Sequence, residues 1–119
     1  MPEQKVEEVI DAQMFRLVDE EGRVRGALTM DDGGVALVFT DQKGTARASI
    51  RLTETGAPHI TLYDDNGDGR GVFNLIGGEP TIGLTDGEGS LRATIGIHEG
   101  EPLVEMYSDD GQVIWKQPT

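Results

Sequence analysis

The chain lacks several features on which common classes of protein depend. It has no cysteine, so it forms no disulfide framework and carries out no thiol chemistry. It has 10 basic against 22 acidic residues, and a net charge of −12 excludes the basic footprint that nucleic acid requires. No apolar run approaches the ~18 residues that span a membrane, and the start, Pro2-Glu3-Gln4-Lys5, has no signal-peptide pattern. These absences predict a soluble protein without nucleic-acid partners or membrane insertion, and they favour the cytoplasm.

Glycine, in contrast, is abundant, and five glycines recur at intervals of 22 or 23 residues: Gly22, Gly44, Gly67, Gly89 and Gly111. The residues three positions before them are Asp19, Asp41, Asp64, Asp86 and Ser108. The residues three positions after them are Arg25, Arg47, Arg70, Arg92 and Ile114. A repeat of this length indicates a fold built from copies of one supersecondary unit.

Apolar and polar residues alternate within each unit. In residues 46–52, for example, alanine, isoleucine and leucine alternate with arginine and serine. A period of two is typical of a half-buried strand, and each unit holds two such segments of roughly 5–8 residues. The sequence therefore predicts an all-β fold over residues 14–119, an antiparallel meander of about ten short strands from five hairpin repeats. Residues 1–13 form a lead-in segment outside the repeat, for which a short helix and a strand are both open.

The glycines also predict the turns and the strand register. Glu21-Gly22 and its four counterparts fit two-residue type I′ loops, with a longer loop as the alternative where Glu or Lys comes first. This register pairs a large residue with a small one in four of five hairpins. The five predicted pairs are Leu17–Gly26, Phe39–Ala48, Leu62–Gly71, Leu84–Ala93 and Met106–Trp115. The turns at the other end of the strands are predicted to be longer than these and irregular. A specific ligand, if the protein binds one, is expected at those turns.

One face of such a sheet is apolar and has to be covered. Two arrangements would cover it: closure into a monomeric barrel or prism, and self-association of copies, for example as a trimer. Trp115 replaces the small residue in the last unit, as an end cap of a stacked array would. This substitution and the large-to-small pairing favour a homo-oligomer.

One stretch resembles the opening of a calcium-binding loop. Asp64, Asn66 and Asp68 stand at alternate positions, and Gly69 follows them. Oxygen ligands for calcium, a hard cation, have this spacing. The twelfth position, which requires a bidentate Glu, is Leu75. Because the stretch is also the third copy of the repeated turn, a plain acidic turn is the favoured interpretation.

A second candidate site is the series of arginines on the polar face, Arg25, Arg47, Arg70 and Arg92, which the two-residue loops place opposite Val18, Thr40, Tyr63 and Thr85. A row of guanidinium groups would bind anions such as phosphate or acidic glycans. Alternatively, each arginine pairs with the aspartate six residues earlier and holds the hairpins in register. The periodic placement favours the structural role.

No residues are predicted to be catalytic, and no cofactor is expected. His59 and His98 occupy unrelated positions of the repeat and have no metal-ligand spacing. Ser49, Ser90 and Ser108 lack a nucleophile elbow or a nearby base. These residues therefore do not indicate an enzyme.

The motif Phe-x-Leu-x-Asp-x-x-Gly-x-x-Arg-x-x-Leu of residues 15–28 resembles that of uncharacterised bacterial β-hairpin-repeat proteins, which include tail-fibre-like and surface-associated proteins. The closing residues 111–115 are similar to the ends of such chains, and the resemblance covers roughly residues 14–115. It implies an architecture and no catalytic residues.

We therefore expect a non-catalytic structural or protein-interaction module that self-associates through its apolar sheet face. A closed barrel that carries a small apolar ligand and an anion- or glycan-binding surface formed by the arginines are the alternatives.

Overall fold

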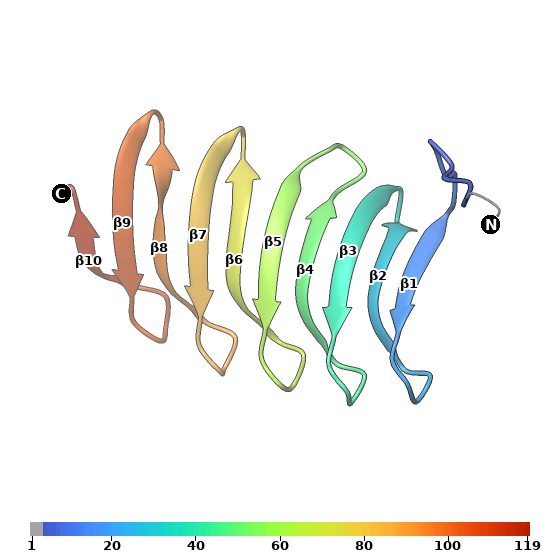
Figure 1. Ribbon diagram of the computed structural model, residues 1–119. Helices are drawn as coiled ribbons and strands as arrows, with labels where there is room; N and C mark the ends of the chain where they lie inside the picture. Colours follow the sequence, from blue (N-terminus) through green and yellow to red (C-terminus); the bar gives the residue numbers. More distant parts are fainter. Residues whose placement is uncertain (1–3) are drawn as a thin grey trace.

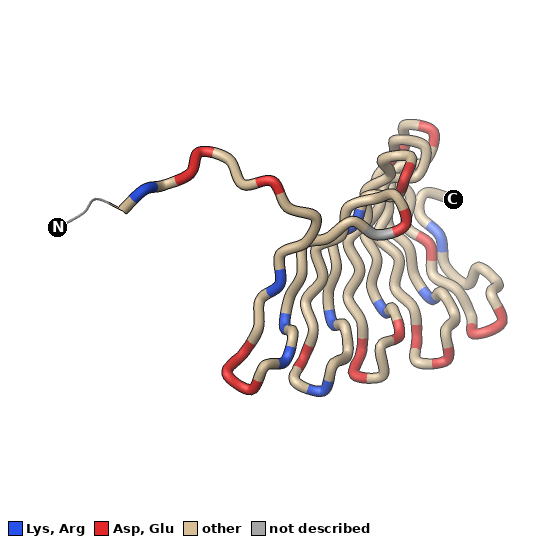
Figure 2. Tube along the Cα trace, turned by 90° about the vertical axis from the view of Figure 1, so that its right-hand side faces the viewer, with Lys and Arg blue, Asp and Glu red and all other residues tan. Residues whose placement is uncertain are grey.

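The computed structural model describes residues 4–119, in which residues 14–117 form one antiparallel sheet of ten strands (Figure 1). The strands are β1 Met14–Val18, β2 Val24–Asp31, β3 Gly34–Thr40, β4 Ala46–Leu52, β5 Pro58–Tyr63, β6 Gly69–Ile76, β7 Glu79–Thr85, β8 Leu91–His98, β9 Glu101–Tyr107 and β10 Val113–Gln117. They lie in chain order, so the predicted all-β meander is confirmed. Residues 4–13 form neither the helix nor the strand considered for them, and they extend away from the sheet (Figure 2).

The register of the hairpins agrees with the large-to-small pairing in the sequence. Leu17 lies opposite Gly26, Gly26 opposite Phe39, and the series of direct pairs continues through every strand. This first row of the apolar face reads Leu17, Gly26, Phe39, Ala48, Leu62, Gly71, Leu84, Ala93, Met106 and Trp115. Each glycine or alanine of the row leaves room for its larger neighbours, which fixes the face that each strand presents.

The sheet is open, so the predicted closure into a monomeric barrel or prism is not supported. β1 and β10 lie at opposite ends of the sheet (Figure 1). The register supplies the physical reason. A barrel closes only when its strands tilt and their pairing is staggered around the axis. Here the first row runs straight from Leu17 to Trp115 without an accumulated offset, so the two edges never approach each other.

The five turns that contain the repeated glycines form the glycine rim of the sheet, and their geometry differs from the predicted two-residue loop. The N–H of Gly22 donates to the carbonyl of Asp19 at 3.0 Å, and the N–H of Asp19 to the carbonyl of Arg23 at 2.9 Å. Gly22 has a φ of 83° and no other residue of this turn has a positive φ. The loop is a type I turn followed by a left-handed glycine that starts a bulge. This three-residue loop is more stable than a type I′ loop because a type I′ loop would force Glu21 or Lys43 into the left-handed region, at about 1–2 kcal/mol per residue.

The opposite rim holds the tight turns, which reverses the expectation of longer, irregular loops there. Asp32-Gly33, Gly77-Gly78 and Glu99-Gly100 each connect two strands directly, with positive φ at both residues. These are the two-residue type I′ loops. Only the turn from Thr53 to Ala57 is longer, with the same hydrogen-bond pattern as the glycine rim.

Residues 4–119 leave the apolar face of the sheet uncovered. Two further rows lie beside the first one. The middle row contains Phe15, Leu28, Leu37, Ile50, Ile60, Phe73, Ile82, Ile95 and Val104, and the third contains Met30, Val35, Leu52, Pro58, Leu75, Pro80, Ile97 and Pro102. Ala36, on the other face, is the one hydrophobic residue that is buried among the described residues, whereas Leu17 stays 69% exposed. No helix of residues 4–119 is long and apolar enough to cross a membrane.

Candidate functional site

The aspartate three residues before each repeated glycine closes its turn with the side chain. One carboxylate oxygen of Asp64 accepts the backbone N–H groups of Asn66 and Asp68 at 3.0 and 3.1 Å. Three more turns, those of Asp19, Asp41 and Asp86, contain the same two bonds at 2.9–3.1 Å. In the last turn, the hydroxyl oxygen of Ser108 accepts the N–H of Gln112 at 3.1 Å. The side chains thus satisfy backbone donors that the turn leaves free.

The arginine three residues after each of the first four glycines sits in a second bulge, next to the one that the glycine starts. Val18 pairs with Val24, so Arg25 is the extra residue between two paired positions. The prediction that the arginines lie opposite residues of the preceding strand is therefore wrong, because the bulge shifts the pairing by one residue. The pairs at these positions are Val18–Val24, Thr40–Ala46, Tyr63–Gly69 and Thr85–Leu91.

Each of these arginines makes two contacts. Arg70 donates from Nε to the carbonyl of Thr85 at 2.6 Å, and its Nη1 lies 3.4 Å from Asp64 Oδ2. In the same way, Nε donates at 2.8–3.0 Å in the pairs Arg25–Thr40, Arg47–Tyr63 and Arg92–Tyr107. The corresponding Nη1–Oδ2 distances are 3.7 Å for Arg25–Asp19, 3.5 Å for Arg47–Asp41 and 3.1 Å for Arg92–Asp86.

These contacts connect successive hairpins along the glycine rim. The aspartate belongs to the turn of the arginine's own hairpin, and the carbonyl belongs to the last residue of the next strand, which begins the following hairpin. We call this series of four links the Asp–Arg ladder; its side chains are Asp19, Asp41, Asp64, Asp86, Arg25, Arg47, Arg70 and Arg92. Figure 2 shows the acidic residues at the turns of this rim and basic residues just inside them. The first link is the longest because Arg23 also contacts Asp19, at 2.9 Å.

The ladder ends differently at the two edges of the sheet. At the C-terminal edge, Ile114 takes the place of the arginine, so the last hairpin supplies no guanidinium. At the N-terminal edge, Val18 is the last residue of β1, as Thr40 is the last residue of β3. Within residues 4–119, however, no ladder arginine precedes Val18 as Arg25 precedes Thr40. The carbonyl acceptors of the ladder were missed by sequence reasoning, since a backbone oxygen leaves no residue-type signal.

Hydrogen bonding holds the ladder carboxylates in their charged form. The pKa values of Asp41, Asp64 and Asp86 are lowered, chiefly by the backbone N–H four residues later and also by the N–H two residues later and the arginine. For Asp19, partial burial is the largest single influence and raises the pKa. The hydrogen bonds from Arg23 and Glu21 together outweigh it, so that its pKa is lowered too.

The calcium-like stretch lies in one of these turns. One oxygen of Asp64 accepts two backbone N–H groups and the other faces Arg70, so the carboxylate is already engaged by donors. Among the described residues, no group of three or more histidine and acidic side chains is placed to hold a metal ion. This geometry favours the acidic turn over a calcium site.

The histidines and serines lie in separate surroundings. Ser49 is buried on the polar face and shares a hydrogen bond of 3.0 Å with the hydroxyl of Tyr63. Ser90 donates its N–H to Asp86, and the hydroxyl of Ser108 donates to Asp110. None of these serines contacts His59 or His98 through a hydrogen bond of the described chain, so the structure brings no nucleophile and base together.

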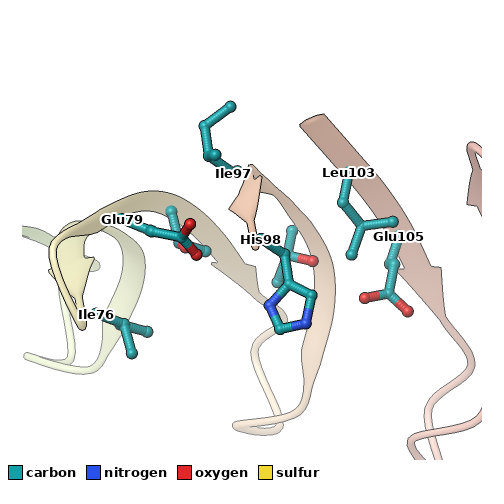
Figure 3. Close-up of a pocket in the computed structure, with 9 residues that line it drawn as sticks. Ile76, Glu79, Ile97, His98, Leu103 and Glu105 are labelled. Atoms are coloured by element: carbon teal, nitrogen blue, oxygen red, sulfur yellow. The ribbon is translucent and has the colours of Figure 1, made fainter. Parts of the chain in front are cut away.

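His98 lines an open hollow of about 250 Å³ on the polar face (Figure 3). Glu79 and Glu105, from the strands on either side, line it as well. The carboxylate of Glu79 accepts the N–H groups of Glu99 and Gly100 at 3.0 and 2.9 Å. Glu79 therefore fixes the neighbouring tight turn, and its carboxylate has a structural role in the wall of the hollow.

The fold and the rim together define a single-sheet protein of antiparallel β-hairpins with one ladder of charged side chains and one uncovered apolar face. No protein-family model matches the chain, and no curated protein matches it.

Proposed function

We propose that this protein is a non-catalytic structural module that self-associates through its apolar face. The observation that carries the proposal is the amount of surface that the single chain leaves exposed. The accessible surface is 9085 Å², whereas a compact monomer of 12.8 kDa exposes about 6,300 Å². The extended residues 4–13 contribute part of the difference, and the rest comes from a sheet whose two faces are both open.

The apolar face is large enough for a stable interface. Its first row runs from β1 to β10, the middle row from β1 to β9 and the third from β2 to β9. The large side chains of the middle row remain about half exposed, for example Phe73 at 46% and Ile95 at 52%. Part of the excess surface, roughly 2,800 Å² by the scaling for compact proteins, belongs to this face, and the rest belongs to the polar face and to residues 4–13. Isolated exposed hydrophobic residues are common, but a continuous face of this size marks a contact surface.

The width of the face suits three copies around a common axis. Rows two residues apart are separated by ~6.8 Å, so three rows span about 14 Å between their Cα atoms. Facing sheets pack ~10 Å apart, which puts each sheet about 5 Å from a central axis, and an equilateral triangle of that size has sides of about 17 Å. A trimer in which the middle rows meet at the axis is therefore the arrangement that we propose.

The two alternative functions have less support in the geometry. A carrier of a small apolar ligand needs a lumen, and the open sheet has none. An anion- or glycan-binding surface would need guanidinium groups with free donors, whereas each ladder arginine already donates to a carbonyl and faces a carboxylate.

A matched pair of substitutions tests the proposal. Leu62 is 58% exposed on the apolar face and Ile76 is 63% exposed on the polar face, so in a monomer both changes to Lys would have small, similar effects. We expect Leu62→Lys to reduce the molar mass measured by light scattering to that of one chain, and Ile76→Lys to leave the oligomer intact. Equal masses for both variants and the wild type would contradict association through this face.

A further inference from the structure

The outer edge of β1 is an open pairing edge, separate from the apolar face. Backbone groups alternate in direction along an antiparallel strand, and the tight turn at Asp32-Gly33 sets the phase of that alternation. Counting from this turn, Phe15 and Leu17 direct their N–H and C=O groups to β2. Met14, Arg16 and Val18 direct theirs outward, where the described chain has no further strand. β1 therefore presents the row of unpaired groups on which another strand can add.

The outward carbonyl of Val18 is equivalent to the carbonyls that accept the ladder arginines. Val18 ends β1 as Thr40 ends β3, one residue beyond the first row of the apolar face. The carbonyl of Thr40 receives a guanidinium Nε from the strand before it, at 2.8 Å, and the other three ladder carbonyls do the same. No ladder arginine of residues 4–119 lies on the outer side of Val18. Its carbonyl thus stands where a strand with a suitably placed arginine would complete a fifth link.

The edge at β10 is built differently. Ile114 stands in the ladder position, and Pro118, which has no N–H to donate, follows the strand directly. Lys116 is the last residue but one of the strand. Proline and lysine at an edge both oppose strand addition. A second copy of this chain that added through β10 would bring isoleucine in place of arginine to β1. One that added through its own β1, with Arg16 opposite Val18, would place Leu17 against Leu17 and break the large-to-small row.

We propose that the β1 edge binds a strand from a different chain, added antiparallel and carrying an arginine opposite Val18. Such a strand resembles β4 as it pairs with β5: Ala48 is the small residue that faces Leu62, and Arg47 donates to the carbonyl of Tyr63. A small residue of the partner opposite Leu17 continues the large-to-small row, and its arginine reaches the Val18 carbonyl. Backbone pairing supplies the affinity, and the arginine supplies the specificity.

The test uses the full chain and a fluorescent peptide with the sequence of residues 44–52, read by fluorescence anisotropy. The matched control peptide replaces Arg47 with Lys, which keeps the charge and removes the Nε–H fork. We expect the Arg peptide to bind at least about tenfold more tightly than the Lys peptide. Equal affinities, or no binding of the Arg peptide, would overturn the proposal.

A substitution in β1 locates the binding site. Arg16→Pro removes one outward N–H and none that faces β2, so binding should be lost, whereas Arg16→Ala should bind the peptide like the wild type. The oligomer mass of both variants should equal that of the wild type, because the edge is not the apolar face. A fall in mass would assign the edge to self-association and overturn the proposal of a different chain. If Arg16→Pro does not fold, amide NMR on the wild-type protein gives the same answer: shifts confined to β1 support the proposal, and shifts elsewhere contradict it.

Discussion

The guanidinium of Arg70 and the carboxylate of Asp64 face each other at 3.4 Å although six residues separate them in the chain. The bulge that follows Gly67 turns Arg70 back over its own turn, and Nε of the same side chain reaches the carbonyl of Thr85. One arginine thereby connects two hairpins. Four such links give the open sheet a reinforced rim in place of a hydrophobic core.

Arg70→Ala should therefore destabilise the sheet through the contact between hairpins. The hydrogen bond to the Thr85 carbonyl contributes about 1 kcal/mol to the free energy of unfolding, and the exposed ion pair adds less. Urea unfolding at fixed protein concentration measures the change. Arg16→Ala, which removes an arginine outside the ladder, is the control, and an equal loss in both variants would show that the ladder link has no special role.

Acid should weaken the rim. The pKa values of Asp41, Asp64 and Asp86 are lowered in the folded protein, so their contribution to stability is complete above the unfolded pKa of about 4 and is lost as the pH falls through the lower folded pKa. The melting temperature should be flat from pH 7 to about 5 and fall below pH 4. Asp64→Asn should make this acid slope shallower. Asp65→Asn, in the same turn but outside the ladder, should leave the slope as it is; a slope that both variants change equally would speak against the ladder carboxylates.

Two glycines of the repeat should respond in opposite ways to alanine. Gly44 has a φ of 91° with open space around it, so Gly44→Ala should cost about 1–2 kcal/mol from the backbone alone. Gly71 has no positive φ, and an added Cβ would meet Leu84 at an ordinary 3.9 Å. Ala48 and Ala93 already occupy the equivalent positions, so Gly71→Ala should be neutral or stabilising by up to about 1 kcal/mol. Chemical denaturation ranks the two variants, and the reverse order would contradict the assigned turn.

Calcium should have no effect on stability at the turn of Asp64. Its carboxylate already accepts two N–H groups and faces Arg70, so a cation would have to displace these donors. Melting curves in 1 mM calcium and in chelator should coincide, with the concentration chosen near the weakest biological calcium sites of about 10⁻³ M. A melting temperature that rises with calcium and returns to its starting value in Asp68→Asn would restore the calcium interpretation.

The sequence predicted the register because side-chain volume carries that information. Leu17 and Phe39 need small partners, and Gly26 lies between them at the right distance along the chain. The turn type was assigned wrongly although its signature was present: aspartate at the first position and glycine at the fourth is typical of a type I turn. Glu21 and Lys43 also argue against a type I′ loop, because these residues poorly tolerate a positive φ.

The openness of the sheet and the contacts of the arginines are not visible in local patterns. Closure depends on the stagger that accumulates over ten strands, which no single hairpin reveals. The contact of Arg25 with the carbonyl of Thr40 depends on the bulge, and the bulge follows from the turn. Once the turn was assigned to the wrong type, the arginines were placed opposite the wrong residues.

The molar mass of the wild-type protein in solution tests the central claim most directly. Sedimentation equilibrium on the purified chain, whose mass is 12.8 kDa, should give three times this value and keep it on dilution into the micromolar range. In the proposed trimer, removal of the apolar face from water is the driving force of association. A species of one chain mass at all concentrations would contradict the account.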